Sequence, residues 1–370
     1  MACSVKRRKL ISSLGLGAGA GAGAMLSSCG GDEAGAGMST KRVQWTLASS
    51  YPKSLDTIFG FAEQMANRVK EITGGRFTID VYQAGEIMPG GEVFNAVQEK
   101  TVEIGHSAAY YYRSKHPAFA FETAVPFGLR ARQQQAWLTY GGGLDLMNEL
   151  LDDFNIRTLP GGNTGQQMGG WFRDEINSLE DLKGLKMRIP GMGGEIMSRL
   201  GATVQTIQSN EIYPALERGA IDAVEWVGPY DDQKLGFWQV AKHYYYPGWW
   251  EPGANLSIYV NQTAWADLPP SYQAVLEAAC AESAAGMIAS YDAKNPIALQ
   301  ELIAKGVKVH AFGDDIMQAA KRETELLHAE LSEENAGYKK VYEQWKAFKD
   351  ASDAWYGTAE QTFAEFDLRN

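Results

Sequence analysis

Three segments of the chain carry side chains that could bind a small anion. The first, residues 161–173, reads GGNTGQQMGGWFR, with five glycines and a final arginine. Glycines let a backbone approach a ligand closely, and the guanidinium of Arg173 presents a planar fork of donors that matches a carboxylate. The segment therefore predicts a carboxylate site at Arg173. The alternative is a surface arginine at the edge of a strand.

The second segment, residues 222–232, reads DAVEWVGPYDD and points to a bound cation. Val224 and Glu225 should face opposite sides of a strand, so Glu225 projects into a cleft. A carboxylate beside a bound anion would repel it unless a cation lay between them. The oxygens of Glu225 and of the Gln167 amide suit sodium or calcium. The alternative is a salt-bridged glutamate.

The third segment, residues 244–253, reads YYYPGWWEPG and is mainly aromatic. Such a run can line a pocket or fill an interface between domains, and packing is the commoner use. Glu251 lies between Trp250 and Pro252, where a packing role alone does not explain a carboxylate.

The elements that must position these segments begin with a βαβ unit. Residues 43–47 alternate as a strand, a helix follows Ser54 and ends at Gly74 and Gly75, and residues 77–81 alternate again. This order implies a parallel strand pair and an α/β architecture.

A weak internal repeat indicates two lobes. Residues 93–104, VFNAVQEKTVEI, align with residues 212–223, IYPALERGAIDA, each reading as a short helix, a turn and an emerging strand. Ligands of open α/β sheets bind just beyond the carboxyl ends of strands. The repeat thus predicts two lobes that face one cleft, and chance similarity over twelve residues is the alternative.

Further elements follow the repeat. Residues 185–189 read as a strand, residues 256–260 as an apolar strand that returns to the first lobe, and Pro269 opens a helix to about Lys305. A helical stretch from Asp314 onward carries aromatic residues that could clasp the two lobes or a second subunit.

The composition favours a binding protein over the common enzyme classes. The 370 residues are 45% hydrophobic and 21% charged, enough for two globular domains. The formal charge is −11, and it is −15 without the first 29 residues, so nucleic-acid binding is disfavoured. The sequence has no CxxC, HExxH, GxxxxGK[ST] or GxSxG motif.

The first forty residues read as an export signal followed by a flexible tether. Residues 6–11, KRRKLI, precede a glycine-rich apolar stretch that predicts export by the twin-arginine route, and the alternative is a disordered basic leader. Leu-Ser-Ser-Cys ends at Cys29 and resembles a lipobox, which predicts a lipoprotein anchored to the membrane outside the cytoplasm. The alternative is an ordinary cleavage site with an incidental cysteine. Residues 30–41 read as a flexible tether, and Cys280 as a buried structural residue.

The three segments, together with LEDLKGLKMRIPG at 179–191, resemble the solute-binding components of tripartite ATP-independent periplasmic (TRAP) transporters over about residues 42–350. The most similar branch binds 2-oxo acids such as pyruvate and hydroxy acids such as lactate. The resemblance implies a two-lobed α/β fold of the periplasmic binding protein type II kind, with a hinge and long C-terminal helices. It also implies a receptor, not an enzyme, that delivers a small monocarboxylate to a membrane permease.

The same resemblance implies roles for individual residues. Arg173 would hold the substrate carboxylate, and Gln167, Glu225 and the Trp226 carbonyl would bind a sodium or calcium ion, with Glu251 as a further candidate. The residues expected to contact substrate are Arg173, Asn163, Gln167, Tyr51, Tyr110 and Trp226.

The chain is expected to divide into two lobes, each made of two separate stretches of sequence. Lobe I takes residues 42–165 plus about 254–300, and lobe II takes 166–253 plus about 301–345. Residues 346–370 form a C-terminal helix that dimerises in this branch. The rival functions are a TRAP receptor for a sugar acid or polyol, and an exported enzyme that uses a cation at Glu225. The lipobox departs from the usual soluble form of the family.

Overall fold

The computed structural model describes residues 37–368. The predicted export signal, Cys29 and most of the predicted tether lie outside the described residues. From Met38 onward the chain forms one compact unit. The expected tether ends earlier than residue 41, because the Ser39 amide donates to Ser271 Oγ (3.1 Å) and the Tyr272 hydroxyl donates to the carbonyl oxygens of Ser39 and Lys41.

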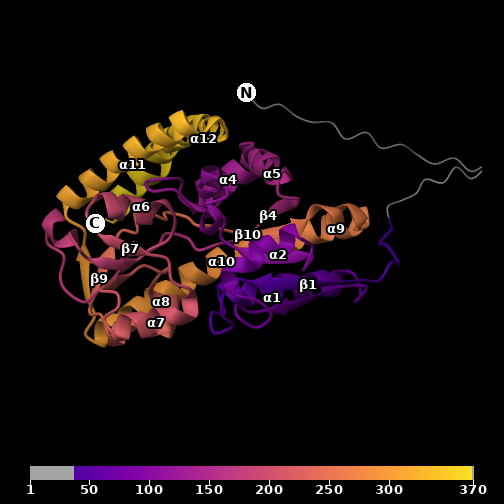
Figure 1. Cartoon of the computed structure of the whole chain (residues 1–370), viewed down its shortest axis with the longest axis horizontal. Coiled ribbons are helices and arrows are strands. Elements are labelled where there is room, and N and C mark those ends of the chain that lie inside the picture. Colours follow the sequence, from indigo (N-terminus) through magenta and orange to yellow (C-terminus); the bar gives the residue numbers. More distant parts are fainter. Residues whose placement is uncertain (1–36, 369–370) are drawn as a thin grey trace, which may run out of the picture. The chain divides into compact units, whose positions relative to one another are not determined.

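The first sheet has the strand order β2-β1-β3-β10-β4, and its strands β1, β4 and β10 are labelled in Figure 1. Its strands are β1 (Val43–Ser49), β2 (Phe77–Tyr82), β3 (Ile104–Ser107), β4 (Ile156–Asn163) and β10 (Asn255–Asn261). Helix α1 (Ile58–Ile72) connects the parallel strands β1 and β2, which confirms the predicted βαβ unit. Strand β10 pairs antiparallel with β3 and β4, so the chain does return to this sheet as predicted.

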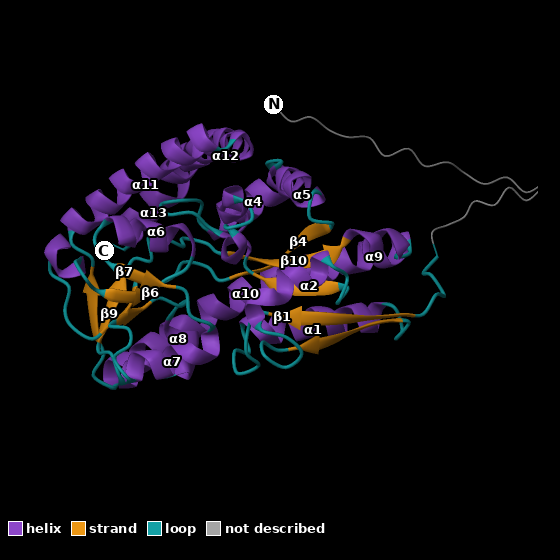
Figure 2. Cartoon of the chain, in the orientation of Figure 1, coloured by secondary structure: helices purple, strands orange, loops and turns teal. Residues whose placement is uncertain are grey.

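The second sheet has the order β11-β9-β5-β8-β6-β7 and forms a separate group of strands (Figure 2). Its strands are β5 (Gly170–Phe172), β6 (Lys186–Arg188), β7 (Thr203–Gln205), β8 (Ala223–Val224), β9 (His243–Tyr246) and β11 (Lys308–Ala311). The chain crosses between the sheets from β4 to β5, from β9 to β10, and along the helix that precedes β11. A two-sheet α/β fold joined by several crossings is therefore confirmed.

Most helices pack on the sheets, and the longest helix packs against elements of both halves of the molecule. The remaining helices are α2 (Val93–Gln98), α3 (Ala120–Thr123), α4 (Ala131–Tyr140), α5 (Gly143–Asp152), α6 (Gly191–Arg199), α7 (Ser209–Glu217), α8 (Pro229–Leu235), α9 (Gln262–Asp267), α10 (Pro270–Ala304), α11 (Asp314–Glu334), α12 (Ala336–Tyr356) and α13 (Thr362–Asp367). Helix α10 packs against β4 and α1 and, further along its length, against α8. None of the helices within residues 37–368 is both long and apolar enough to cross a membrane.

The internal repeat is real in structure as well as in sequence. In both copies a short helix (α2 or α7) leads through a tight turn into a strand (β3 or β8). Lys100 and Gly219 occupy the same place in that turn with φ of 58° and 72°. The next amide in each copy, Thr101 or Ala220, donates to the carbonyl of Ala96 or Ala215. Lys100 thus adopts a left-handed conformation that glycine adopts more easily.

The C-terminal helices join the two halves within one chain. Helix α11 packs on α6 beside the second sheet, while α12 packs on α3, α4 and α5 beside the first (Figure 1). The Trp345 ring of α12 lies 5.2 Å from the Phe121 ring of α3. Two expected lobe boundaries, near 300 and 345, fall inside the continuous helices α10 and α12, so those helices belong to both halves. Cys280 of α10, the one cysteine within residues 37–368, is buried, as expected.

Candidate functional site

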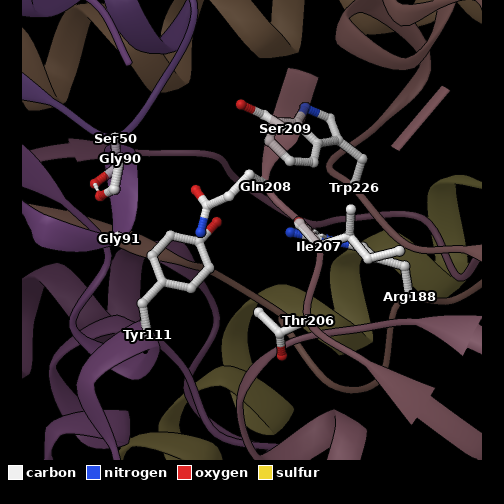
Figure 3. Close-up of a pocket in the computed structure, with 10 residues that line it drawn as sticks. All are labelled: Ser50, Gly90, Gly91, Tyr111, Arg188, Thr206, Ile207, Gln208, Ser209 and Trp226. Atoms are coloured by element: carbon white, nitrogen blue, oxygen red, sulfur yellow. Dashed lines mark hydrogen bonds between the residues drawn. The ribbon is translucent and has the colours of Figure 1, made fainter. Parts of the chain in front are cut away.

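Two adjoining cavities lie where the two sheets face each other. The larger has a volume of about 80 Å³ and is lined by Ser50, Gly90 and Gly91 beside the first sheet and by Arg188, Gln208 and Trp226 beside the second (Figure 3). The smaller has a volume of about 10 Å³, and its lining includes Tyr51, Tyr110, Thr164 and Gln167. Tyr111, Arg188 and Trp226 line both. Both lobes therefore contribute to one site, as the repeat predicted.

Arg188 is the buried cation of this site. It is the last residue of β6, which runs parallel to β7 and β8, so it lies at the carboxyl end of a parallel strand, where α/β sheets bind ligands. Its Nη1 donates to the carbonyl oxygen of Glu225 (2.7 Å) and to Glu225 Oε2 (3.1 Å). The guanidinium carbon lies 5.1 Å from the centre of the Trp226 ring. These contacts hold a guanidinium in position at the wall of both cavities.

Two buried carboxyl groups, Glu225 and Glu251, accompany this arginine. Burial first, and then the charge of Glu251, raise the pKa of Glu225 well above its ordinary value, against the opposing effect of Arg188. Burial raises the pKa of Glu251 to about 7, although Arg188 lowers it. The Tyr110 hydroxyl donates to Glu251 Oε2 (3.4 Å). Arg188 can balance one of the two negative charges, so ionising both carboxyls calls for a further positive charge.

Two oxygen atoms at the site are suited to such a charge. Gln167 Oε1 and Glu225 Oε1 are both buried without a hydrogen-bond partner among the described residues. The Gln167 amide nitrogen donates to Thr164 Oγ1 (2.9 Å), which turns the amide oxygen away from that hydroxyl. Within residues 37–368 there is no cluster of three or more His, Cys, Asp or Glu side chains that could hold a metal ion. A cation here would thus need amide and carbonyl oxygens as well as carboxylates, a donor set that suits hard cations.

The structure brings most of the sequence-predicted residues together. Tyr51, Tyr110, Gln167 and Trp226 line the smaller cavity, and Glu225 contacts Arg188 at its edge. Burial raises the pKa of the Tyr51 and Tyr110 hydroxyls, so both remain neutral hydrogen-bonding groups.

Asn163 has a different position from that expected. Its Oδ1 accepts from the Gly165 amide (2.9 Å), and its Nδ2 donates to the Gly253 carbonyl (3.3 Å). The side chain ties two backbone segments beside the site, and it is not among the residues that line either cavity.

Arg173 lies away from the cavities, contrary to expectation. Strand β5 is antiparallel to β8, and the Arg173 amide donates to the Asp222 carbonyl, so Arg173 faces the start of β8 while Glu225 follows its end. Asp222, which lies opposite Arg173, and Glu225 are three strand residues apart, a distance of about 10 Å. The Arg173 guanidinium donates to the carbonyl oxygens of Leu216 and Glu217 at the C-terminal end of α7. It caps a helix, where the dipole favours a cation.

The residues that sequence reasoning missed are Arg188, Tyr111, Gln208, Gly90 and Gly91. A signal for Arg188 was present, because this charged residue lies between the apolar residues Met187 and Ile189 near the end of the predicted strand 185–189. The glycine pair and Gln208 belong to segments far apart in the sequence. The local sequence pattern around each of them does not predict that they contact one another.

Comparisons with known proteins agree with this architecture. The profile of the family "Bacterial extracellular solute-binding protein, family 7" matches residues 48–335. A curated relative from Nostoc sp. (strain PCC 7120), named a monocarboxylate 2-oxoacid-binding periplasmic protein, is 48% identical over 98% of this chain and 99% of its own length.

Solved structures give the same result. A TRAP transporter solute-binding protein from Bordetella bronchiseptica RB50, described as a mixed-occupancy dimer with calcium and picolinate in one site, is 46% identical with a TM-score of 0.88, over 89% of this chain and 98% of its own. A TRAP periplasmic solute-binding protein from Pseudoalteromonas atlantica T6c with sodium and pyruvate is 40% identical (TM-score 0.85; 88% and 99% covered). One from Colwellia psychrerythraea with calcium and pyruvate is 38% identical (TM-score 0.85; 88% and 99% covered).

These matches span nearly all of the described residues, and both the family and the fold are those of solute-binding receptors. The chain belongs to family 7 of the bacterial extracellular solute-binding proteins and is, as its motifs predicted, a solute-binding protein of the TRAP type.

Proposed function

We infer that this protein is a periplasmic receptor that binds a small 2-oxo or 2-hydroxy monocarboxylate, such as pyruvate or lactate, and presents it to a TRAP membrane permease. The observation that carries this proposal is Arg188, a buried guanidinium on the wall of both cavities. A small acid has few atoms, so its carboxylate must supply much of its affinity, and an arginine fork matches that group. The names of the Nostoc relative and of the pyruvate-bound structures support the same solute class.

The volumes of the two cavities favour a division of roles. A water molecule needs roughly 10–15 Å³ of such space, so the smaller cavity, at about 10 Å³, suits one ion. The larger, at about 80 Å³, suits the organic acid. Because Arg188 borders both, it can hold the carboxylate next to the ion.

The cation would be bound by Gln167, Glu225 and the Trp226 carbonyl, with Glu251 nearby. When bound, it would balance the second carboxylate and attract the oxygens of the acid. Gln167 Oε1 and Glu225 Oε1 are buried and unpartnered among the described residues, which supports this assignment. Sodium and calcium, each named with a relative of at least 38% identity, both accept such oxygens.

Binding should proceed by closure of the two lobes without covalent chemistry. Residues of both sheets line each cavity, so a bound acid bridges the lobes and stabilises the closed form that a permease would recognise. The rivals are a receptor for a sugar acid or polyol and an exported enzyme.

Calorimetric titration with pyruvate, lactate, glucuronate and a polyol tests the proposal, together with chromatography of each mixture after incubation. We expect heat of binding with pyruvate or lactate and unchanged solute. Binding of glucuronate or the polyol alone would favour the rival receptor, and a new product would favour the enzyme.

Export and anchoring extend the proposal. The twin-arginine signal would deliver the protein to the periplasm, and lipidation of Cys29 would tether it to the membrane. Cys29→Ala should release the protein from the membrane fraction. A parent protein that already fractionates as soluble would contradict the lipid anchor.

The last part of the proposed function is a homodimer that forms through residues 346–370. The end of α12 and helix α13 expose large apolar side chains, among them Trp355 (63% exposed) and Phe363 (67%). Exposed apolar clusters are typical of protein interfaces. Light scattering should give twice the monomer mass, and Trp355→Ser with Phe363→Ser should reduce it to one. A parent that is monomeric at high concentration would contradict this part.

A further inference from the structure

The outer wall of the larger cavity is a contact between Gln208 of one lobe and a glycine pair of the other. Gln208 directly precedes α7, and Gly90 and Gly91 begin a turn of 3₁₀ helix ahead of α2. A methyl group on Gly91 would lie 3.2 Å from Gln208 Nε2, and one on Gly90 would lie 3.2 Å from Gln208 Oε1. Figure 3 shows the Gln208 side chain directed across the cavity toward this pair. A methyl group at either position would therefore be in close contact with the amide.

The two sides of this contact differ in rigidity. Ser50 Oγ donates to the Gly90 carbonyl (2.7 Å) and also bonds Ser107 Oγ (2.7 Å), which fixes the glycine wall to the first sheet. A methyl group on Gly90 would lie 3.0 Å from the Ser50 carbonyl oxygen, so the backbone is close-packed there. Gln208 is exposed to solvent and has no side-chain hydrogen bond among those found in the described residues. It is therefore the movable part of the wall.

The cavity between Arg188 and this wall is small. A cavity of roughly 150 Å³ holds one benzene molecule, so a volume of about 80 Å³ has no room for a long chain. An acid that filled this cavity with its carboxylate at Arg188 would have its later carbons among the other lining residues, which include Gln208 and the glycine pair. Chain length would then be limited by the position of the Gln208 amide.

We propose that Gln208, packed across the cleft against Gly90 and Gly91, sets the upper chain length of the 2-oxo acid that this receptor accepts. The proposal rests on the proposed function and adds a specificity-determining residue to it. Short acids such as pyruvate fit inside the wall. Longer unbranched 2-oxo acids must displace the amide into solvent.

Four proteins test this role by titration with pyruvate and with 2-oxohexanoate: the parent, Gln208→Ala, Gly91→Ala and the double variant. The measured quantity is the ratio of the Kd for 2-oxohexanoate to that for pyruvate. Removing the amide should lower this ratio about tenfold, since one or two methylenes in a pocket are worth about that much. Gly91→Ala should change the ratio by less than Gln208→Ala does, because its methyl would lie 3.2 Å from the end of a side chain that can shift. The double variant should resemble Gln208→Ala, because the methyl then meets no amide.

The ratio separates specificity from closure. If Gln208 only helps the lobes to close, its removal weakens both acids equally and leaves the ratio unchanged, which would overturn the proposal. Asn210→Ala is the matched control, since Asn210 is an exposed amide two residues away that does not line the cavity. Gly91 has no positive φ, so alanine is allowed there, and thermal melts verify folding. A parent that binds neither of these acids nor lactate would refute the proposed function, whereas a parent that binds pyruvate, with the same ratio in Gln208→Ala, refutes only the role of Gln208.

Discussion

Arg188 donates from one nitrogen, Nη1, to both the backbone carbonyl and the carboxylate of Glu225, at 2.7 and 3.1 Å. Both side chains are almost fully buried, at 3% and 1% exposure. The bond to the carbonyl ties the guanidinium to the end of β8, and the bond to the carboxylate fixes which oxygen of Glu225 remains available. One residue thus orients the group proposed to bind the acid and the group proposed to bind the cation.

Replacing Arg188 should abolish binding, and replacing Arg173 should not. Loss of one partner from a buried, hydrogen-bonded charge pair costs about 2–5 kcal/mol, or roughly 30- to several-thousand-fold in Kd. Arg188→Lys keeps the charge but loses the fork, so it should bind pyruvate with intermediate strength. Calorimetric titration of Arg188→Ala, Arg188→Lys and Arg173→Ala measures this.

Thermal melts without ligand complete that experiment. Arg188→Ala leaves Glu225 without its buried partner, so some loss of stability is expected, and Arg188→Lys shows whether binding is lost independently of folding. Parent-like affinity in Arg188→Lys, or lost affinity in folded Arg173→Ala, would contradict the assignment.

The two arginines show which features the sequence could predict. The βαβ unit and the helix-turn-strand repeat depend on the periodicity of apolar residues within short segments, which is local, and they were predicted correctly. Arg173 was misplaced because the end of a strand that faces the cleft depends on pairing direction, and β5 runs antiparallel to β8. Gln208 was missed because its contact with Gly90 and Gly91 exists only when the two lobes face each other.

Cation binding should weaken as the pH falls below neutrality. Burial raises the pKa of Glu251 to about 7 and that of Glu225 well above its ordinary value. The two carboxyl groups bind a cation in their deprotonated form. Protons therefore compete with the ion for these groups and are released when the ion binds. Titration of the metal-free protein with sodium and with calcium at pH 6 and pH 8 should give tighter binding at pH 8.

The same samples test whether the cation supports solute binding. Pyruvate should bind more weakly to metal-free protein, and one of the two ions should restore its affinity. In Glu225→Gln the added ion should fail to do so, whereas Glu211→Gln, a change at an exposed glutamate of α7, should behave like the parent. Equal affinity for pyruvate with and without the ion would mean that Glu225 has another role.

A buried carboxyl outside the site, Glu122, should make the protein less stable as the pH rises. Its Oε1 accepts from the hydroxyls of Thr158 and Ser257, and burial raises its pKa to about 7 against those bonds. Between the ordinary value of 4.5 and about 7, the unfolded chain has released a proton that the folded protein retains, so the free energy of unfolding falls with pH.

Glu122→Gln isolates this effect because the amide resembles the protonated carboxyl. Relative to the variant, the parent should lose stability between about pH 4.5 and 7, with little further change above that range. Urea unfolding of both proteins across pH 4.5–8 measures the difference. The comparison cancels other buried groups, such as His106, whose pKa burial lowers to about 3 and which acts in the opposite direction. Parallel stability curves would show that Glu122 is not retained in its protonated form.

Two tryptophans of the same helix should differ sharply in their effect on stability. Trp345 of α12 is 4% exposed and packs on Phe121 of α3, so Trp345→Ala removes part of the contact between the C-terminal helices and the first half of the molecule. Truncating a buried tryptophan costs about 3–5 kcal/mol. Trp355, ten residues further along α12, is 63% exposed, and Trp355→Ala should change the free energy of unfolding by less than about 0.5 kcal/mol in the monomer. Urea unfolding followed by circular dichroism, at a concentration where light scattering shows monomers, gives both values. Equal losses in the two variants would contradict the idea that the packing of Trp345 on α3 dominates the contribution of α12 to stability.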